Sequence, residues 1–193
     1  AHYELLLRMR DEQGALVSPD LFIAAAERYG ITPRIDRWVV ETALRWLVSE
    51  ADERERLTLC SINLSGQSLV DDDFLPFVVR QFQRSGLDPT KICFEITETS
   101  AIANYAQASR FINALKELGC KFALDDFGTG LSSFGYLKHF PVDGIKIDGL
   151  FVKGIAKNYL DYALVESIHK IAVSLGLQTV AEVGIDFVEN SVI

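Results

Sequence analysis

The stretch Phe122-Ala123-Leu124-Asp125-Asp126-Phe127-Gly128-Thr129-Gly130 joins an apolar run, two adjacent carboxylates and a loop with two glycines. The apolar run is long enough for a buried strand, and the two aspartates close it. Burying a charge is unfavourable unless it is paired or bound to a metal, so this arrangement indicates a cation. Asp and Gly also favour turns, and one isolated pattern of this kind would indicate only a turn. A metal site is therefore expected only if the pattern recurs.

The composition is that of an ordinary globular domain. The chain has 193 residues, 49% of them hydrophobic and 24% charged, which suits one domain with a substantial core. The net charge is -8, from 27 acidic and 19 basic residues. A general nucleic-acid binder needs a basic face, so no DNA or RNA polymer is expected as a partner. A phosphate ligand remains possible if divalent metals and a few basic side chains supply positive charge.

The cysteines and the hydropathy indicate an intracellular setting. Cys60, Cys93 and Cys120 are odd in number, lie in apolar runs and lack C-x-x-C spacing, so reduced core thiols are expected. No run reaches transmembrane length, and no signal peptide opens the chain. We therefore expect a cytoplasmic domain without membrane contact, either on its own or as the cytoplasmic part of a membrane-anchored sensor.

Strands and helices are expected to alternate at a spacing that suits βα units. The expected strands are 3–9, 57–64, 92–96, the run that opens at 122, 144–148 and 178–182. The expected helices begin at 19, 33, 74, 105, 132 and 160, and the helix 33–49 should turn Ile35, Trp38, Val39, Ala43, Trp46 and Leu47 inward. This order predicts a (β/α) barrel, with a doubly wound open sheet as the alternative. The barrel is favoured because polar residues lie at many strand ends, whereas an open sheet binds ligand mostly at one switch point.

Polar side chains recur within or at the ends of the expected strands. They are Glu4, Asn63, Glu95, Asp125, Asp126, Lys146 and Glu182. In a barrel the C-terminal ends of the strands converge on one mouth, where catalytic groups collect. Carboxylate and amide oxygens suit Mg²⁺ or Mn²⁺, whereas zinc prefers histidine and cysteine.

Each of these residues also has a structural explanation. Glu4 could pair with Arg8 across one strand face, Asn63 could cap a turn, and Lys146 could be a salt-bridge partner. The expected core strands contain only Arg8 and Lys146 as cations, so pairing does not account for several buried acids. Two clustered metals are a general device for phosphoester hydrolysis, which predicts a metal-dependent phosphoesterase. In such an enzyme Lys146 could contact the attacking water, and Arg8 a phosphate oxygen.

Six motifs follow one another along the chain: Glu4-Leu5-Leu6-Leu7-Arg8, Asn63-Leu64-Ser65, Glu95-Ile96-Thr97-Glu98, Asp125-Asp126-Phe127-Gly128-Thr129-Gly130, Lys146-Ile147-Asp148 and Ala181-Glu182. Their order resembles that of the EAL-domain family, bacterial cyclic di-GMP phosphodiesterases. The resemblance runs from Tyr3 to about Val183. It implies a modified TIM (β/α)8 barrel that hydrolyses cyclic di-GMP to linear pGpG with two ions, Mg²⁺ or Mn²⁺, and is inhibited by Ca²⁺.

The resemblance also implies roles for individual residues. The implied metal ligands are Glu4, Asn63, Glu95, Asp125 and Asp126, with Asp125 bridging both ions. The implied catalytic residues are Lys146 and Glu182, which hold or activate the water, and Glu98. Glu98 and Thr129 resemble the pair that tethers the control loop Phe127, Gly128, Thr129 and Gly130, which is linked with dimerisation. The implied substrate contacts are Arg8, Leu6 and Asp148.

The chain departs from the family pattern at two places. Leu5 replaces alanine in the signature, and little effect is expected because it faces away from Glu4. After Val183 the family's helix is absent, and 184–190 resembles the last strand, with Glu189 in place of glutamine. We therefore expect that the first barrel strand and a segment after Val183 are missing. The sequence 1–193 is then a single domain excised from a longer protein with sensory or GGDEF-type domains, acting as a homodimer.

A catalytically inactive EAL module that binds cyclic di-GMP as a receptor is the alternative function. Degenerate members lose metal ligands, whereas all the motif positions remain here. A third possibility, an unrelated metal-dependent barrel enzyme, accounts for the carboxylates but not for the ordered motifs. The sequence therefore favours the phosphodiesterase.

Overall fold

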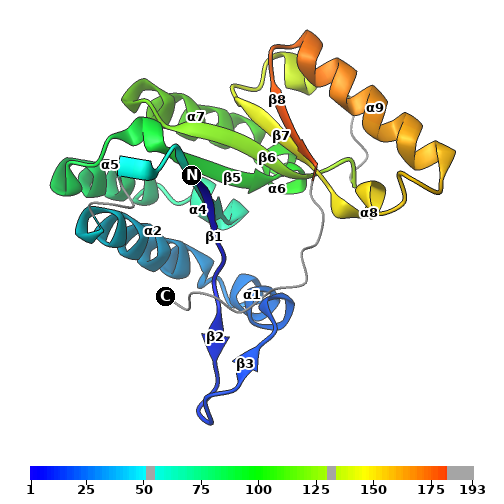
Figure 1. The fold of residues 1–193 in the computed structure, drawn as a ribbon. Helices are drawn as coiled ribbons and strands as arrows, with labels where there is room; N and C mark the ends of the chain where they lie inside the picture. Colours follow the sequence, from blue (N-terminus) through cyan, green and yellow to red (C-terminus); the bar gives the residue numbers. More distant parts are fainter. Residues whose placement is uncertain (51–54, 130–133, 182–193) are drawn as a thin grey trace.

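The computed structural model describes residues 1–50, 55–129 and 134–181, and its centre is one curled parallel sheet (Figure 1). Within this sheet, each strand pairs with the next strand of the same sheet along the chain. The six strands, in spatial order, are β1 (His2–Leu5), β4 (Leu59–Leu64), β5 (Ile92–Thr97), β6 (Lys121–Phe127), β7 (Gly144–Ile147) and β8 (Gln178–Ala181).

Helices connect the strands and surround the sheet, and a small antiparallel hairpin projects away from it (Figure 1). The hairpin strands are β2 (Met9–Arg10) and β3 (Leu16–Val17). The helices are α1 (Pro19–Arg28), α2 (Thr32–Ser49), α4 (Gly66–Leu69), α5 (Phe74–Ser85), α6 (Glu98–Ala103), α7 (Tyr105–Leu118), α8 (Gly149–Val152) and α9 (Tyr159–Ser174). Two 3₁₀ turns are η1 (Pro89–Lys91) and η2 (Tyr136–Lys138).

The strand order identifies the architecture as barrel-like. A doubly wound sheet reverses its strand order at a switch point, whereas the order β1-β4-β5-β6-β7-β8 never reverses. The predicted barrel-type α/β fold is therefore confirmed, as a curled partial barrel, for the residues that the structure describes. The predictions on Gly130, Glu182 and the segment after Val183 lie outside those residues.

Side chains alternate across the sheet, and the two faces differ in chemistry. The outward-pointing positions are apolar and buried beneath the helices, and they include Ile62, Ile92, Phe94, Ile96, Phe122 and Leu124. On the inner face the register places Asn63 beside Glu95, and Glu95 beside Ala123. The outer layer therefore holds the hydrophobic core, and the inner face is left with polar and small side chains.

The first expected strand, 3–9, is wrong in its extent. β1 ends at Leu5, and a local hairpin takes over at Met9. The turn of that hairpin stabilises itself, because Asp11 Oδ1 accepts hydrogen bonds from the backbone of Gln13 and Ala15. The expected shared strand face of Glu4 and Arg8 is therefore absent from β1.

The expected apolar stripe of helix α2 is also partly wrong. Ala43 and Leu47 are buried as expected, but Trp38 is 55% exposed. The buried side of the helix instead includes Asp36 and Val40. Because the stripe is rotated relative to the expectation, a carboxylate lies among the buried residues of the helix.

The prediction that the three cysteines are core thiols is confirmed. Cys60, Cys93 and Cys120 are buried and form no disulfide. Burial raises the pKa of each thiol to about 12, so all three stay protonated at neutral pH. None of the described helices has the length and apolar character required to cross a lipid bilayer.

Replacing Phe122 tests the outer core. Its side chain is fully buried, and its ring lies 5.6 Å from that of Phe94 and 6.2 Å from that of Phe111. Phe122→Ala is expected to lower the free energy of unfolding by about 3–5 kcal/mol, as measured by urea unfolding, because it leaves a cavity. The control Leu160→Ala, at a position that is 69% exposed, should change it by less than about 0.5 kcal/mol. Equal losses in the two variants would contradict this placement of the core.

Candidate metal and phosphate site

A three-residue pattern recurs at the ends of strands β4, β5 and β7. The three copies are Asn63-Leu64-Ser65, Glu95-Ile96-Thr97 and Lys146-Ile147-Asp148. The first residue points to the inner face, the second is apolar, and the third accepts a backbone hydrogen bond at the start of the next helix. This repeated strand end places a polar side chain at the end of each strand and starts a helix immediately after it.

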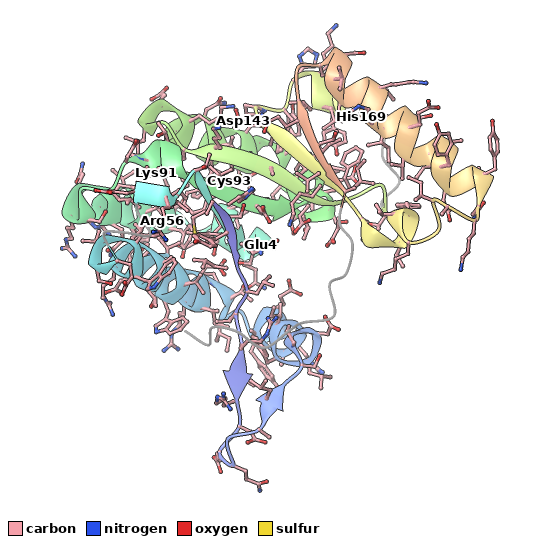
Figure 2. The ribbon with its side chains drawn as sticks, viewed as in Figure 1. Glu4, Arg56, Lys91, Cys93, Asp143 and His169 are labelled. Carbon is pink, nitrogen blue, oxygen red and sulfur yellow. The ribbon has the colours of Figure 1, made fainter. Side chains whose placement is uncertain are left out.

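Three carboxylates meet at this edge of the sheet. One carboxylate oxygen from each of Glu4, Glu95 and Asp125 lies within 4.8 Å of the others. In Figure 2 the labelled Glu4 lies on β1, away from Lys91, which precedes β5. The sheet therefore brings together three of the predicted metal ligands from three different strands.

The Lys146 ammonium lies among these carboxylates. Its Nζ is 2.6 Å from Glu95 Oε2, 3.3 Å from Asp125 Oδ2 and 3.4 Å from Glu4 Oε1. Lys146 is 6% exposed and Glu95 is 4% exposed, so their ion pair is almost completely removed from water. The cluster is therefore an electrostatic network at the strand ends, buried at Lys146 and Glu95 and open to solvent at Glu4.

Asn63 and Ser61 flank the cluster on the inner face of β4. Asn63 Nδ2 donates to Glu4 Oε1 at 3.2 Å, which places this predicted ligand in the cluster. The Ser61 hydroxyl hydrogen-bonds Glu95 and lies 3.1 Å from His2 Nε2. Burial raises the pKa of Glu95, and the hydrogen bonds from Lys146 and Ser61 oppose that rise. Ser61 was missed from the sequence, although its spacing of two residues from Asn63 puts it on the same face.

A β-bulge shapes the Asp125-Asp126 pair. Leu124 pairs with Ile145 and Phe127 pairs with Ile147, so one extra residue of β6 lies opposite β7. The bulge therefore places both aspartates opposite Lys146 in the strand pairing, and the Asp125 carboxylate lies 3.3 Å from Lys146 Nζ. Asp126 has φ of 52°, a left-handed conformation that is uncommon for residues other than glycine. Among the described residues, the compact carboxylate cluster contains Asp125 and does not extend to Asp126.

Glu98 connects the loop after β6 to the turn η2. This carboxylate is 1% exposed, and it accepts hydrogen bonds from the Gly128 amide at 3.1 Å and the Tyr136 hydroxyl at 2.7 Å. Burial and the Glu98 carboxylate raise the pKa of Tyr136, so the hydroxyl remains a donor. Gly128 has φ of 103°, and a Cβ there would lie 3.0 Å from Phe151. The Thr129 hydroxyl donates to the Asp126 carbonyl at 2.9 Å. The sequence contains no signal that indicated the role of Tyr136 in this loop.

The predicted substrate contacts lie just beyond strand ends. Leu6 and Arg8 follow β1, and the Arg8 guanidinium donates to the Leu7 carbonyl at 2.9 Å. Asp148 follows β7 and accepts a hydrogen bond from the Leu150 amide at 2.6 Å. All three are therefore placed at the same edge of the sheet as the carboxylates.

The donor set fits a hard divalent cation. Glu4, Glu95 and Asp125 offer carboxylate oxygens, and Asn63 adds an amide beside them. Three carboxyl groups around one ammonium give this site more acidic than basic groups, and a divalent cation would supply the balancing positive charge. Oxygen ligands of this kind suit Mg²⁺, Mn²⁺ or Ca²⁺ and not zinc.

Comparisons with known proteins agree with this geometry. The chain is 44% identical over 187 residues to the cyclic di-GMP phosphodiesterase PdeB of Shewanella oneidensis. The matched region covers 97% of this chain and 21% of that protein. It is 38% identical over 191 residues to the cyclic di-GMP phosphodiesterase PdeF of Escherichia coli, covering 98% and 25%. The chain thus spans about a fifth to a quarter of these relatives.

Solved structures share the fold over most of the chain. The PaMucR phosphodiesterase in complex with c-di-GMP matches with a TM-score of 0.86 and 31% identity, over 95% of this chain and 74% of that one. The FimX EAL domain from Pseudomonas aeruginosa, bound to c-di-GMP, matches with a TM-score of 0.84 and 30% identity, over 93% and 72%. The model of the EAL domain matches residues 1–190. The chain therefore belongs to the EAL domain family.

Proposed function

We propose that this domain hydrolyses cyclic di-GMP to linear pGpG and depends on two divalent cations, Mg²⁺ or Mn²⁺. The observation that carries the proposal is the contact of Lys146 Nζ with three clustered carboxylates at the strand ends. The names of the similar proteins, cyclic di-GMP phosphodiesterases, support the substrate. Because the chain covers only part of those proteins, we also propose that further domains adjoin it.

Each residue of the site has a proposed part in the reaction. When bound, the cations supply a hydroxide nucleophile and stabilise the leaving oxygen. Glu4, Asn63, Glu95 and Asp125 would hold one cation, and Asp125 and Asp126 would hold the second. Lys146 donates a hydrogen bond to the attacking water or to the developing charge on the phosphate.

The remaining predicted residues act on the substrate and on the loop. Arg8 binds a phosphate oxygen, and Leu6 and Asp148 contact the nucleotide. Glu182 acts with Lys146 on the water. Glu98 holds the loop that follows Asp126, through the Gly128 amide. The homodimer, the cytoplasmic location and inhibition by Ca²⁺ stay predictions.

Removing metal ligands tests the hydrolysis directly. Purified domain with Mg²⁺ or Mn²⁺ should convert cyclic di-GMP to pGpG, and EDTA should stop the reaction. Glu4→Gln and Asp125→Asn should each lower kcat/KM by at least about 100-fold, because each removes a metal-binding oxygen charge. Asp72→Asn changes an exposed acid outside the cluster and should leave kcat/KM unchanged.

The outcomes of that experiment separate the two functions. Full activity of either ligand variant would refute the metal assignment. Binding of cyclic di-GMP without hydrolysis, by wild-type domain with Mg²⁺ or Mn²⁺, would indicate a receptor instead.

Removing the Lys146 charge tests the electrostatic network. Lys146→Met leaves three carboxylates facing one another, so the metal-free variant should unfold at a lower temperature than the wild type. Mn²⁺ should raise its unfolding temperature by more than it raises that of the wild type, because the cation relieves a larger repulsion. The value of kcat should fall about 100-fold or more, with a smaller change in substrate affinity.

A matched control for Lys146 is Lys170→Met. Lys170 pairs with Glu166 one turn away on α9, and its side chain is 68% exposed. An exposed pair of this kind contributes little to stability, so the unfolding temperature and kcat should both stay near the wild-type values. If Lys146→Met behaved in the same way, Lys146 would have no part in the site.

A further inference from the structure

Asp36 is a buried carboxylate that the proposed reaction does not use. It lies on α2 among the buried residues of that helix and is 8% exposed. In the part of the chain that the structure describes, no lysine or arginine forms a salt bridge with it. Burial raises the pKa of this carboxyl, so the ionised form is disfavoured here. A position that would suit an apolar residue thus holds an acid.

The Asp36 carboxylate binds the turn that follows β4. Its Oδ2 accepts hydrogen bonds from the Ser65 amide at 2.8 Å and the Ser68 hydroxyl at 2.6 Å. The Ser65 hydroxyl donates to Ser68 Oγ at 3.2 Å and accepts from the Ser68 amide at 3.3 Å. Asp36 therefore hydrogen-bonds both the Ser65 amide and the Ser68 hydroxyl. These hydrogen bonds hold the turn in the geometry seen here.

Asn63 lies at the end of β4, just before this turn. Ser65 follows Asn63 by two residues, and Leu64 between them is buried in the core. Leu64, buried in the core, and the Ser65 amide, bound by Asp36, fix the backbone directly after Asn63, which itself pairs with Glu95 in the sheet. Asn63 is thereby held where its amide contacts Glu4 Oε1 at 3.2 Å.

The corresponding turn after β5 shows what Asp36 adds. Thr97 and Ser100 repeat the cap of Ser65 and Ser68, with the Thr97 hydroxyl 2.9 Å from Ser100 Oγ. There the structure records no buried carboxylate on either residue within the described ranges. After β4 the helix α4 has only 4 residues, and a single turn needs tertiary contacts to hold its orientation. Asp36 provides one such contact from the neighbouring helix, beside the hydrogen bonds that Gln67 of α4 makes with the Thr32 hydroxyl and the Glu27 carbonyl.

We propose that Asp36 is a positioning residue that sets Asn63 for cation binding by anchoring the turn Ser65–Ser68. The inference rests on the proposed metal-dependent function and extends the site to helix α2. Asp36 acts on Asn63 indirectly, through the backbone of Ser65 and Leu64, and the loss of groups that orient a metal ligand commonly weakens metal binding by about 10- to 100-fold.

Mn²⁺ binding measures this role without relying on turnover. Titration of the purified domain, with free Mn²⁺ followed by electron paramagnetic resonance, gives the concentration for half-saturation. Asp36→Ala should raise it about 10-fold or more. Asp36→Asn keeps an oxygen that accepts the same two hydrogen bonds, so its half-saturation should stay within about threefold of the wild type.

Val40→Ala separates positioning from stability. Val40 lies one turn further along the same buried side of α2 and is fully buried. Its truncation should lower the thermal midpoint, as Asp36→Ala does, but should leave Mn²⁺ half-saturation unchanged. If Asp36→Ala is not folded, Ser68→Ala replaces it, with an expected rise of about threefold or more because one donor to Asp36 is lost.

Each result decides between the possibilities. Wild-type half-saturation in a folded Asp36→Ala or Ser68→Ala domain, or an equal rise in Val40→Ala, would overturn the positioning role. A wild type that binds Mn²⁺ but forms no pGpG would contradict the proposed hydrolysis alone, since the Asp36 comparison is read from binding. A wild type that binds no Mn²⁺ would overturn both.

Discussion

The buried pair of Lys146 and Glu95 is the interaction on which the site depends. Removing two charges from water is unfavourable, and their attraction offsets this only where further hydrogen bonds complete the network. Here Lys146 also contacts Asp125 and Glu4, and Ser61 supports Glu95. These partners come from β1, β4, β5, β6 and β7, so the network forms only when the sheet has curled and its neighbours are in register. The geometry of the site thus depends on five of the six strands of the sheet.

The two faces of the sheet have different roles: the outer face stabilises the fold, and the inner face carries the polar groups of the site. The outer face contributes the hydrophobic core, with Phe94, Phe122 and Leu124 fully buried against the helices. The inner face is free to hold acids, an amide and an ammonium because it does not supply that core. Polar residues at strand ends are unfavourable in a core layer but suitable on a face that binds a cation and a phosphate. Strand alternation is the physical origin of this division.

Much of the site could be predicted because strand alternation is visible in sequence. Glu95 lies between Phe94 and Ile96, so the pattern itself assigns it to the face opposite the core. The bulge at Asp125-Asp126 was not predictable in this way, because strict alternation leaves no place for the extra residue of β6 between Leu124 and Phe127. The end of β1 was missed because a local turn at Asp11 decides where the hairpin begins. The burial of Asp36 was missed because its partners, Ser65 and Ser68, are remote in sequence. Tyr136 carries no charge pattern, and only the folded loop reveals its contact with Glu98.

The three-residue pattern at the ends of β4, β5 and β7 restricts how this edge of the molecule can vary in evolution. In each copy the polar residue and the helix cap are separated by a single apolar residue, as in Asn63-Leu64-Ser65. Adding or deleting one residue there would rotate the polar side chain into the helix layer, since the side-chain period of a strand is two. Substitutions leave that spacing intact, whereas length changes do not. Genetic variation at these three strand ends is therefore expected to be limited to replacements, while insertions accumulate in loops farther from the sheet.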